Sequence, residues 1–247
     1  MSNQGDQICF KKSRYIIYRP YAGLHLAYHA KRFLFTGKSK YQKVDIIENE
    51  AYGRMLFLDS NVQHTEYDAR AFNEALCGFA KISGQARFIV LGGGSGQTVM
   101  SLLDSESVKH VKVIEIDKMV VEACQRHIKG VRQAFDDPRV RIVIGDAFSY
   151  VHEMREHFDG AIIDFTELPF RLKSNLKLLR QLYADIRVKC GGRCSQYIGS
   201  SVGLAYGPRL RKLADTVATQ YLSTPRYREV FIPSFGAPHT FLHAGYD

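Results

Sequence analysis

The stretch IVLGGGSGQTV, residues 89–99, decides the fold. An apolar run of strand length is followed by glycines at positions 92, 93, 94 and 96, and a helical segment begins directly after them. Glycine lets a backbone approach a ligand closely, and the first amides of a helix have no partner inside that helix. A glycine-rich turn between a strand and a helix therefore predicts a site for a nucleotide-like ligand at the edge of a parallel sheet.

Around this turn, apolar runs alternate with helical patterns. The runs RFIVLG, HVKVIEID, RVRIVIGD and DGAIIDF have the length of buried strands, and each precedes a segment with helical spacing. This alternation predicts an α/β fold in which a parallel sheet carries helices on both faces. Just before the first run, TEYDARAFNEALCGFA places Ala71, Ala75, Leu76 and Phe79 on one face of a further helix.

The N-terminal part of the chain has a different pattern. The short β-rich runs YIIY, LHLAYHA, RFLF, KVDIIE and RMLFLD lie between Tyr15 and Glu66, separated by Gly, Ser and Asn turn signals. We therefore expect a small antiparallel β domain over residues 1–66 and an α/β domain over residues 67–247.

Composition limits the class of protein. With 247 residues, of which 45% are hydrophobic, the chain can bury a full core. The N-terminus has no apolar signal region, and no stretch approaches the roughly 18 apolar residues of a membrane span, so we expect a cytoplasmic protein that does not contact a membrane. The cysteines are too scattered for a disulfide framework or a zinc site and are expected to be reduced: Cys9, Cys77, Cys124, Cys190 and Cys194.

The formal net charge is +9, and basic residues crowd the segment 171–193. The simpler interpretation is the solvent-facing side of a helix. The alternative is a surface for an acidic partner or nucleic acid. No zinc finger, aromatic RNA-binding motif or RGG tract supports nucleic acid, and the basic balance argues mildly against a polycationic substrate.

Two acids stand at the ends of the strands that follow the glycine turn. Glu115, about twenty residues after the turn in VIEID, is placed to accept both hydroxyls of a ribose. Asp146, in VIGDAF, is placed to meet the edge of an adenine base. The alternative is that both acids only cap the helices that follow them. The arrangement fits the adenosine site of S-adenosylmethionine enzymes better than a dinucleotide site.

These residues carry a family resemblance. SKYQ, YGRMLFLD, VQHTEYD, VLGGGSG, VIEID and GDAF occur in the order and spacing of the spermidine and spermine synthases, the polyamine aminopropyltransferases. The resemblance implies a Rossmann-like S-adenosylmethionine-dependent transferase fold whose N-terminal β domain helps to form a homodimer. It also assigns the cofactor-binding residues: Gln42, Gln63, Gly92, Gly94, Ser95, Glu115, Asp146 and Ala147.

The family's acceptor motif matches less closely. Spermidine synthases read DSSDP after the fourth strand and use the last Asp as base, whereas IIDFTELPF offers Asp164 first and Glu167 at that last position. Spermine synthases read D-x-T-x-x-P and use the first Asp, which Asp164, Thr166 and Pro169 match. We therefore expect Asp164 to be the catalytic base and Glu167 to assist, with the opposite assignment left open.

Ser95 departs from the family. Aminopropyltransferases carry at this position an aspartate that binds the ammonium group of decarboxylated S-adenosylmethionine, and serine cannot supply that charge. An aspartate about 4 Å from the carboxylate of ordinary S-adenosylmethionine would cost on the order of 1 to 4 kcal/mol. The putrescine N-methyltransferases also lack the aspartate and share the threonine that is Thr98 here. The resemblance thus favours methyl transfer from S-adenosylmethionine, and 3-amino-3-carboxypropyl transfer fits Ser95 equally well.

The acceptor side also differs from the family. Phe235 replaces a tyrosine that confines the acceptor, and Asn73 replaces a helix Gln or His. Fewer polar anchors then remain for a long polyamine, which favours a smaller amine or an amino-acid-like acceptor. His239 and His243 are more consistent with structural roles unless a base partner is found.

Three functions follow. The first is a transferase that methylates or otherwise alkylates an amine by direct displacement from S-adenosylmethionine, with no metal. The second is a polyamine aminopropyltransferase that uses decarboxylated S-adenosylmethionine. The third is a catalytically silent family member that only binds the cofactor or a partner.

Overall fold

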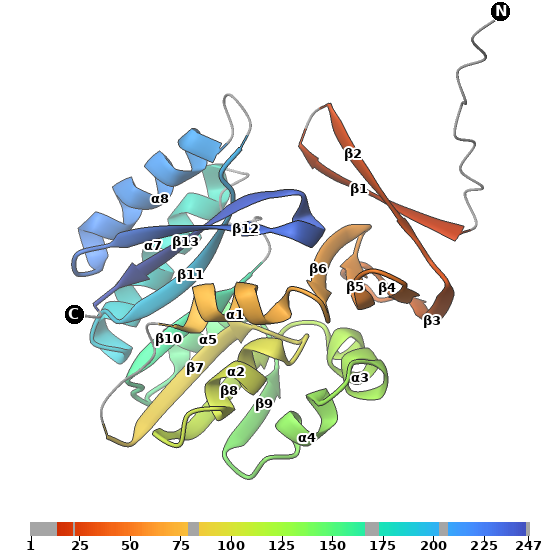
Figure 1. The fold of residues 1–247 in the computed structure, drawn as a ribbon. Helices are drawn as coiled ribbons and strands as arrows, with labels where there is room; N and C mark the ends of the chain where they lie inside the picture. Colours follow the sequence, from red (N-terminus) through yellow and green to blue (C-terminus); the bar gives the residue numbers. More distant parts are fainter. Residues whose placement is uncertain (1–13, 22, 79–83, 166–172, 203–206, 246–247) are drawn as a thin grey trace, which may run out of the picture.

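The N-terminal strands lie beside a larger α/β body (Figure 1). The structure is a computed structural model and describes residues 14–21, 23–78, 84–165, 173–202 and 207–245. Within these ranges, no helix is both long enough and apolar enough to cross a membrane.

Two antiparallel sheets make up the N-terminal part. The strands β1 (Tyr15–Tyr21) and β2 (Leu24–His29) form a hairpin, and a four-stranded sheet follows in chain order: β3 (Arg32–Lys38), β4 (Lys43–Asn49), β5 (Gly53–Leu58) and β6 (Asn61–Thr65). The expected antiparallel β region is therefore present. The sequence patterns did not indicate β6, because NVQHT contains one apolar residue and shows no alternation.

A seven-stranded sheet forms the centre of the larger part. Its order is β12-β13-β11-β10-β7-β8-β9. The parallel strands are β7 (Ala86–Gly92), β8 (Val108–Glu115), β9 (Val140–Ile144), β10 (Gly160–Asp164) and β11 (Cys194–Ser200). The strand order reverses between β7 and β10, and ligands bind at such a point in open α/β sheets.

The last two strands correct the expectation of a wholly parallel sheet. The strands β12 (Arg226–Ile232) and β13 (Ala237–Ala244) pair antiparallel with each other, and β13 pairs antiparallel with β11. Only the short helix η2 (Pro233–Phe235) and one glycine separate β12 from β13. A parallel connection needs a crossover of a dozen or more residues, so this short turn requires the antiparallel arrangement.

Helices cover both faces of the sheet, as expected (Figure 1). One core contains residues of α1 (Ala69–Cys77), α2 (Gln97–Leu103), α3 (Lys118–His127) and α4 (Val131–Phe135). The other contains residues of α5 (Ala147–Glu153), α7 (Lys173–Lys189) and α8 (Gly207–Tyr221). The β1–β2 hairpin joins a third core with η2, through contacts among Ile16, Tyr18, Ile232 and Phe235.

The helix expected before the first parallel strand is α1, but its buried face differs from the prediction. Ala71 is exposed, whereas Asn73, Ala75, Leu76 and Cys77 are buried. Helix α1 packs against α2 and the edge of the sheet at β12, and this contact rotates Ala71 toward solvent. Phe79 lies outside the described residues.

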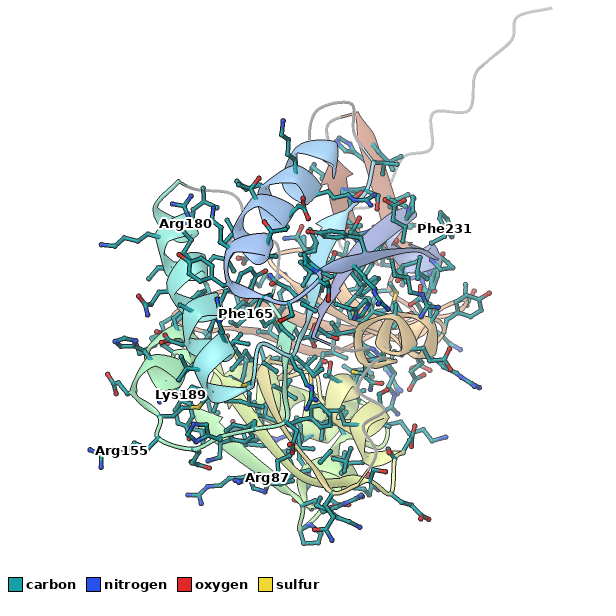
Figure 2. All side chains as sticks on the ribbon, turned by 90° about the vertical axis from the view of Figure 1, so that its left-hand side faces the viewer. Arg87, Arg155, Phe165, Arg180, Lys189 and Phe231 are labelled. Carbon is teal, nitrogen blue, oxygen red and sulfur yellow. The ribbon has the colours of Figure 1, made fainter. Side chains whose placement is uncertain are left out.

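The basic segment forms the solvent-facing side of α7. Lys177, Arg180 and Arg187 are exposed, while Leu179 and Leu182 on the opposite side are buried. Arg180 extends outward from this helix in Figure 2. The cysteines within the described ranges, at 77, 124, 190 and 194, are buried free thiols, as expected from their spacing.

Candidate active site

A cavity of about 400 Å³ lies where the sheet order reverses, at the carboxyl ends of β7, β8 and β10. Strands β5 and β6 and helix α1 form its opposite wall. It brings together all eight cofactor-binding candidates from the sequence, namely Gln42, Gln63, Gly92, Gly94, Ser95, Glu115, Asp146 and Ala147. Asp164, Asn73 and Phe235 also line it.

The backbone of the glycine turn lies very close to Glu115 and to Asp164. A Cβ atom on Gly94 would lie 2.8 Å from Cγ of Glu115, and one on Gly92 would lie 2.5 Å from the carbonyl oxygen of Asp164. Gly92 also has a φ of 85°, which side-chain-bearing residues rarely adopt. Only glycine lets the turn lie against both acids and still leave the cavity open.

Glu115 is held by backbone amides and does not cap a helix. Its carboxylate accepts hydrogen bonds from the amides of Gly94 at 3.1 Å and Asp117 at 2.9 Å. Burial raises the pKa of Glu115, while these two amides act in the opposite direction. Asp117 is the N-cap of α3, because its side chain accepts from the amide of Met119.

Asp117 also anchors the first glutamine of the predicted site, a role that the sequence did not indicate. The side-chain amide of Gln42 donates to Asp117 at 3.1 Å, and the hydroxyl of Ser39 donates to the same oxygen at 2.7 Å. The second acid of VIEID was the available signal. Gln63 is held more loosely, since its amide donates to the carbonyl of Asn61 at 3.3 Å.

Asp146 caps a helix and also lines the cavity. Its carboxylate accepts from the amide of Ser149 at 2.9 Å, so it is the N-cap of α5. It also lines the cavity together with Ala147. Asp146 therefore caps a helix, whereas Glu115 does not, and contact of Asp146 with an adenine stays a prediction.

Asp164 lines the cavity and is supported from behind by the buried side chain of Thr98. The hydroxyl of Thr98 donates to Oδ2 of Asp164 at 2.7 Å and lies 3.3 Å from Oδ1 of Asn73. Asn73 in turn donates to the carbonyl of Ala69 at 2.7 Å, so its side chain is already engaged. Burial raises the pKa of Asp164, and the hydrogen bond from Thr98 partly offsets this rise.

The cavity wall carries more acid than the sequence indicated. Asp68 joins Glu115, Asp146 and Asp164 in the lining, and no Lys or Arg lies among the described lining residues. Asp68 accepts from the hydroxyl of Thr65 at 2.6 Å and from the amide of Ser234 at 2.7 Å. It thus ties the start of α1 to the β12–β13 turn, a contact between segments far apart in the chain.

Two further side chains complete the walls. His64 is buried in the lining, and burial lowers its pKa to about 3, so its imidazole is neutral at physiological pH. The hydroxyl of Ser95 accepts a long hydrogen bond, 3.5 Å, from the amide of Gln97. The wall at this position is therefore uncharged.

The C-terminal histidines lie away from the cavity. His239 and His243 are buried on β13, with Nδ1 atoms 2.7 Å from the hydroxyl of Tyr197 and 2.9 Å from that of Ser195. Neither lines the cavity. Thr166, Glu167 and Pro169 lie outside the described residues. In the part of the chain that the structure covers, no cluster of three His, Cys, Asp or Glu residues could hold a metal ion.

Family models match both parts of the chain. Residues 70–190 match the spermine/spermidine synthase domain, and residues 15–66 match the spermidine synthase tetramerisation domain.

Curated relatives and solved structures agree with these models. Polyamine aminopropyltransferase 1 of Hyperthermus butylicus is 30% identical over an alignment that covers 92% of this chain and 80% of the relative. The polyamine aminopropyltransferase of Clostridium kluyveri is 36% identical over 59% of this chain. That alignment spans 53% of the length of the relative, or about half of it. Spermidine synthase from Thermotoga maritima is 25% identical with a TM-score of 0.82, over 94% of this chain and 80% of its own. The chain therefore belongs to the spermidine/spermine synthase family.

Proposed function

We propose that this chain is an aminopropyltransferase that moves the aminopropyl arm of decarboxylated S-adenosylmethionine to an amine acceptor. The observation that carries this proposal is the charge of the cavity, whose described lining holds four carboxylates and no Lys or Arg. The decarboxylated donor bears a sulfonium and an ammonium and no carboxylate. The carboxylate of ordinary S-adenosylmethionine would find no cationic partner on these walls, and burying an unpaired charge is costly.

This proposal replaces methyl transfer, which the sequence favoured on the basis of Ser95. The relatives described above are named as aminopropyltransferases, which supports the aminopropyl alternative and gives no support to methylation. The described walls also contain four other carboxylates, whose charge favours a cationic donor although position 95 carries a serine.

The chain's own residues fit the donor. Glu115 would accept the ribose hydroxyls, Gly92 and Gly94 leave room beside it, and Gln42 and Gln63 line the opposite wall. Asp146 and Ala147 would contact the adenine. When bound, the donor supplies a sulfonium-activated carbon, which the acceptor nitrogen attacks while the carbon–sulfur electron pair moves to sulfur and a neutral thioether leaves.

Asp164 would act as the base. It lies at the carboxyl end of β10 beside the glycine turn, where an incoming amine must lose a proton to expose its lone pair. We expect Asp164→Asn to keep donor affinity and to lower turnover by roughly 10² to 10⁴. Glu167→Gln should lower it less. The reverse ranking would assign the base to Glu167, whose role stays a prediction.

A second candidate is alkyl transfer from undecarboxylated S-adenosylmethionine, either of the methyl group or of the 3-amino-3-carboxypropyl arm. One observation favours it, the uncharged wall at Ser95. Serine can donate a hydrogen bond to a carboxylate, and it removes the repulsion that an aspartate would exert.

Titration calorimetry with both donors separates the candidates. We expect the decarboxylated form to bind more tightly, and Ser95→Asp to increase that preference. Ser107→Asp, on the turn before β8 at the opposite edge of the sheet, is the matched control. A tenfold preference for ordinary S-adenosylmethionine, about 1.4 kcal/mol, would overturn the proposal in favour of the second candidate. Mass spectrometry of the alkylated acceptor then identifies the transferred group.

The remaining expectations belong to the same proposal. The division at residues 66 and 67 remains a prediction. The match of residues 15–66 to a tetramerisation domain supports a homo-oligomer, for which the sequence-based expectation is a dimer. Light scattering on the purified chain measures the number of subunits. Binding of both donors without turnover of any amine would indicate the silent family member.

A further inference from the structure

A second cavity of about 190 Å³ adjoins the first one. Both cavities are lined by Gln63, Asp164 and Phe235, so both open onto the same carboxylate. Its other walls come from β1 and from the turn between β5 and β6. An acceptor placed here would lie next to Asp164.

Arg19 is the basic residue of this second cavity. Among the described residues that line either cavity, it is the only Lys or Arg. It forms no ion pair within the described part of the chain, and its side chain is exposed. A guanidinium that lines a cavity without a carboxylate partner is available to an anionic group of a ligand.

Arg19 lies at an irregularity in the pairing of β1 with β2. The β1–β2 pairing is irregular between Tyr18 and Tyr21, which is where Arg19 and Pro20 lie. Pro20 has no amide hydrogen to donate to a ladder, and such irregularities redirect side chains. Tyr18 is buried in the core beneath the hairpin and fixes this end of β1. The fold of the hairpin therefore places the backbone of Arg19 at the wall of the second cavity.

The charges of the second cavity discriminate between classes of acceptor. A diamine would place one nitrogen at Asp164 and bring its second, cationic end into the cavity that contains Arg19. Repulsion between like charges a few ångströms apart would lower affinity by about tenfold. Asp59 also lines the cavity and contributes a carboxylate of its own, so both signs of charge face this cavity. One of its oxygens accepts from the amide of Lys43 at 2.8 Å, and among the described ion pairs none joins it to Arg19.

We propose that the acceptor is an amino acid whose carboxylate pairs with Arg19 and whose distal amine faces Asp164. This inference rests on the proposed function. The amine nitrogen forms a bond to the donor carbon, the carbon–sulfur bond breaks with its electron pair moving to sulfur, and Asp164 takes the proton that the nitrogen loses. The product is an N-aminopropyl amino acid and a neutral thioether.

Matched acceptors test this directly. Putrescine and γ-aminobutyrate differ only in the group at one end, as do cadaverine and δ-aminovalerate. With decarboxylated S-adenosylmethionine, we expect a higher kcat/KM for the amino acid of each pair. Arg19→Gln should lower kcat/KM for the amino acids by about tenfold and leave the diamines equal or better. Arg19→Glu should reverse the preference, and Arg14→Gln, an exposed arginine that lines neither cavity, should change nothing.

The outcomes separate the inference from the proposed function. If the chain alkylates diamines better than amino acids and Arg19→Glu leaves the ratio unchanged, the inference is wrong while the aminopropyltransferase assignment stands. If neither donor binds, the proposed function fails. If a donor binds but no acceptor is consumed, calorimetry of γ-aminobutyrate in the presence of 5′-methylthioadenosine decides. Binding that Arg19→Gln abolishes supports the inference, and absence of binding overturns it.

Discussion

Thr98→Val tests whether Asp164 is the base, because the substitution removes a hydrogen bond to the carboxylate and leaves Asp164 itself in place. The hydroxyl of Thr98 donates to Asp164 at 2.7 Å, and valine has nearly the same shape as threonine but no hydroxyl. Thr98 is fully buried in α2, so no solvent hydroxyl can take its place without a rearrangement. The substitution should therefore leave the ionised form of Asp164 less stabilised.

The magnitude follows from the geometry. A hydrogen bond to a charged group contributes about 1.5 to 3 kcal/mol, and one pKa unit corresponds to about 1.4 kcal/mol. Burial already raises the pKa of Asp164, and loss of the Thr98 bond should raise it further. A base must be ionised to accept a proton. The acid limb of the kcat/KM profile should thus move to higher pH, and at a pH on that limb kcat/KM should fall by about tenfold or more.

The assay is turnover of an amine across a pH series, with donor affinity measured in parallel. Thr98→Ser keeps the hydroxyl and should restore the wild-type limb. Thr240→Val removes a hydroxyl that is buried on β13 and bonded to Ser201, and should leave the limb in place. An unshifted limb in Thr98→Val, together with reduced activity at every pH, would show that Thr98 has only a packing role and that Asp164 does not titrate in this step.

Three further predictions concern the donor site and the core. Glu115→Gln should weaken donor binding by about 1.5 to 3 kcal/mol in calorimetry, and unchanged affinity would mean that the ribose binds elsewhere. Gly94→Ala should lower donor affinity because its Cβ would lie 2.8 Å from Cγ of Glu115, whereas Gly145→Ala meets nothing within 4 Å and should not. Burial lowers the pKa of His239 to about 3, so only the unfolded chain takes up this proton below about pH 6.5. His239→Gln should therefore reduce the loss of unfolding free energy between pH 7 and pH 5 by about 2 kcal/mol in urea titrations, and an equal loss in both proteins would contradict the neutral assignment.

Local patterns predicted much of the fold. The glycine turn, the parallel strands and α1 each follow from residues that are neighbours in sequence, and the resulting edge collects Glu115, Asp146 and Asp164 at one cavity. These predictions succeeded because the carboxyl ends of parallel strands lie at one edge of a sheet. The prediction for the buried face of α1 was right at Ala75 and Leu76 and wrong at Ala71, since that face depends on which elements pack against the helix.

Contacts between distant segments could not be predicted in this way. Thr98 and Asp164 are 66 residues apart, and Asp68 and Ser234 are 166 apart. Nothing in the periodicity of α2 or β10 indicates that a threonine hydroxyl would meet a strand-end carboxylate. The same holds for Arg19, which lies on the N-terminal hairpin and lines a cavity together with Asp164.

The charges on the two sides of Asp164 suggest why serine is compatible with this site. The donor cavity already holds four carboxylates, and burial raises the pKa of two of them, Glu115 and Asp164. A further aspartate at position 95 would add a like charge to the same walls and make ionisation of Asp164 harder. Ser95 removes that repulsion, and the lost attraction for a cationic donor is supplied in part by the other acids. On the acceptor side, Arg19 contributes the only positive charge of the described lining, where it can pair with an anionic group of the acceptor. Ser95 therefore avoids a further like charge beside Asp164, and the hydrogen bond from Thr98 acts in the same direction, because it favours the ionised carboxylate.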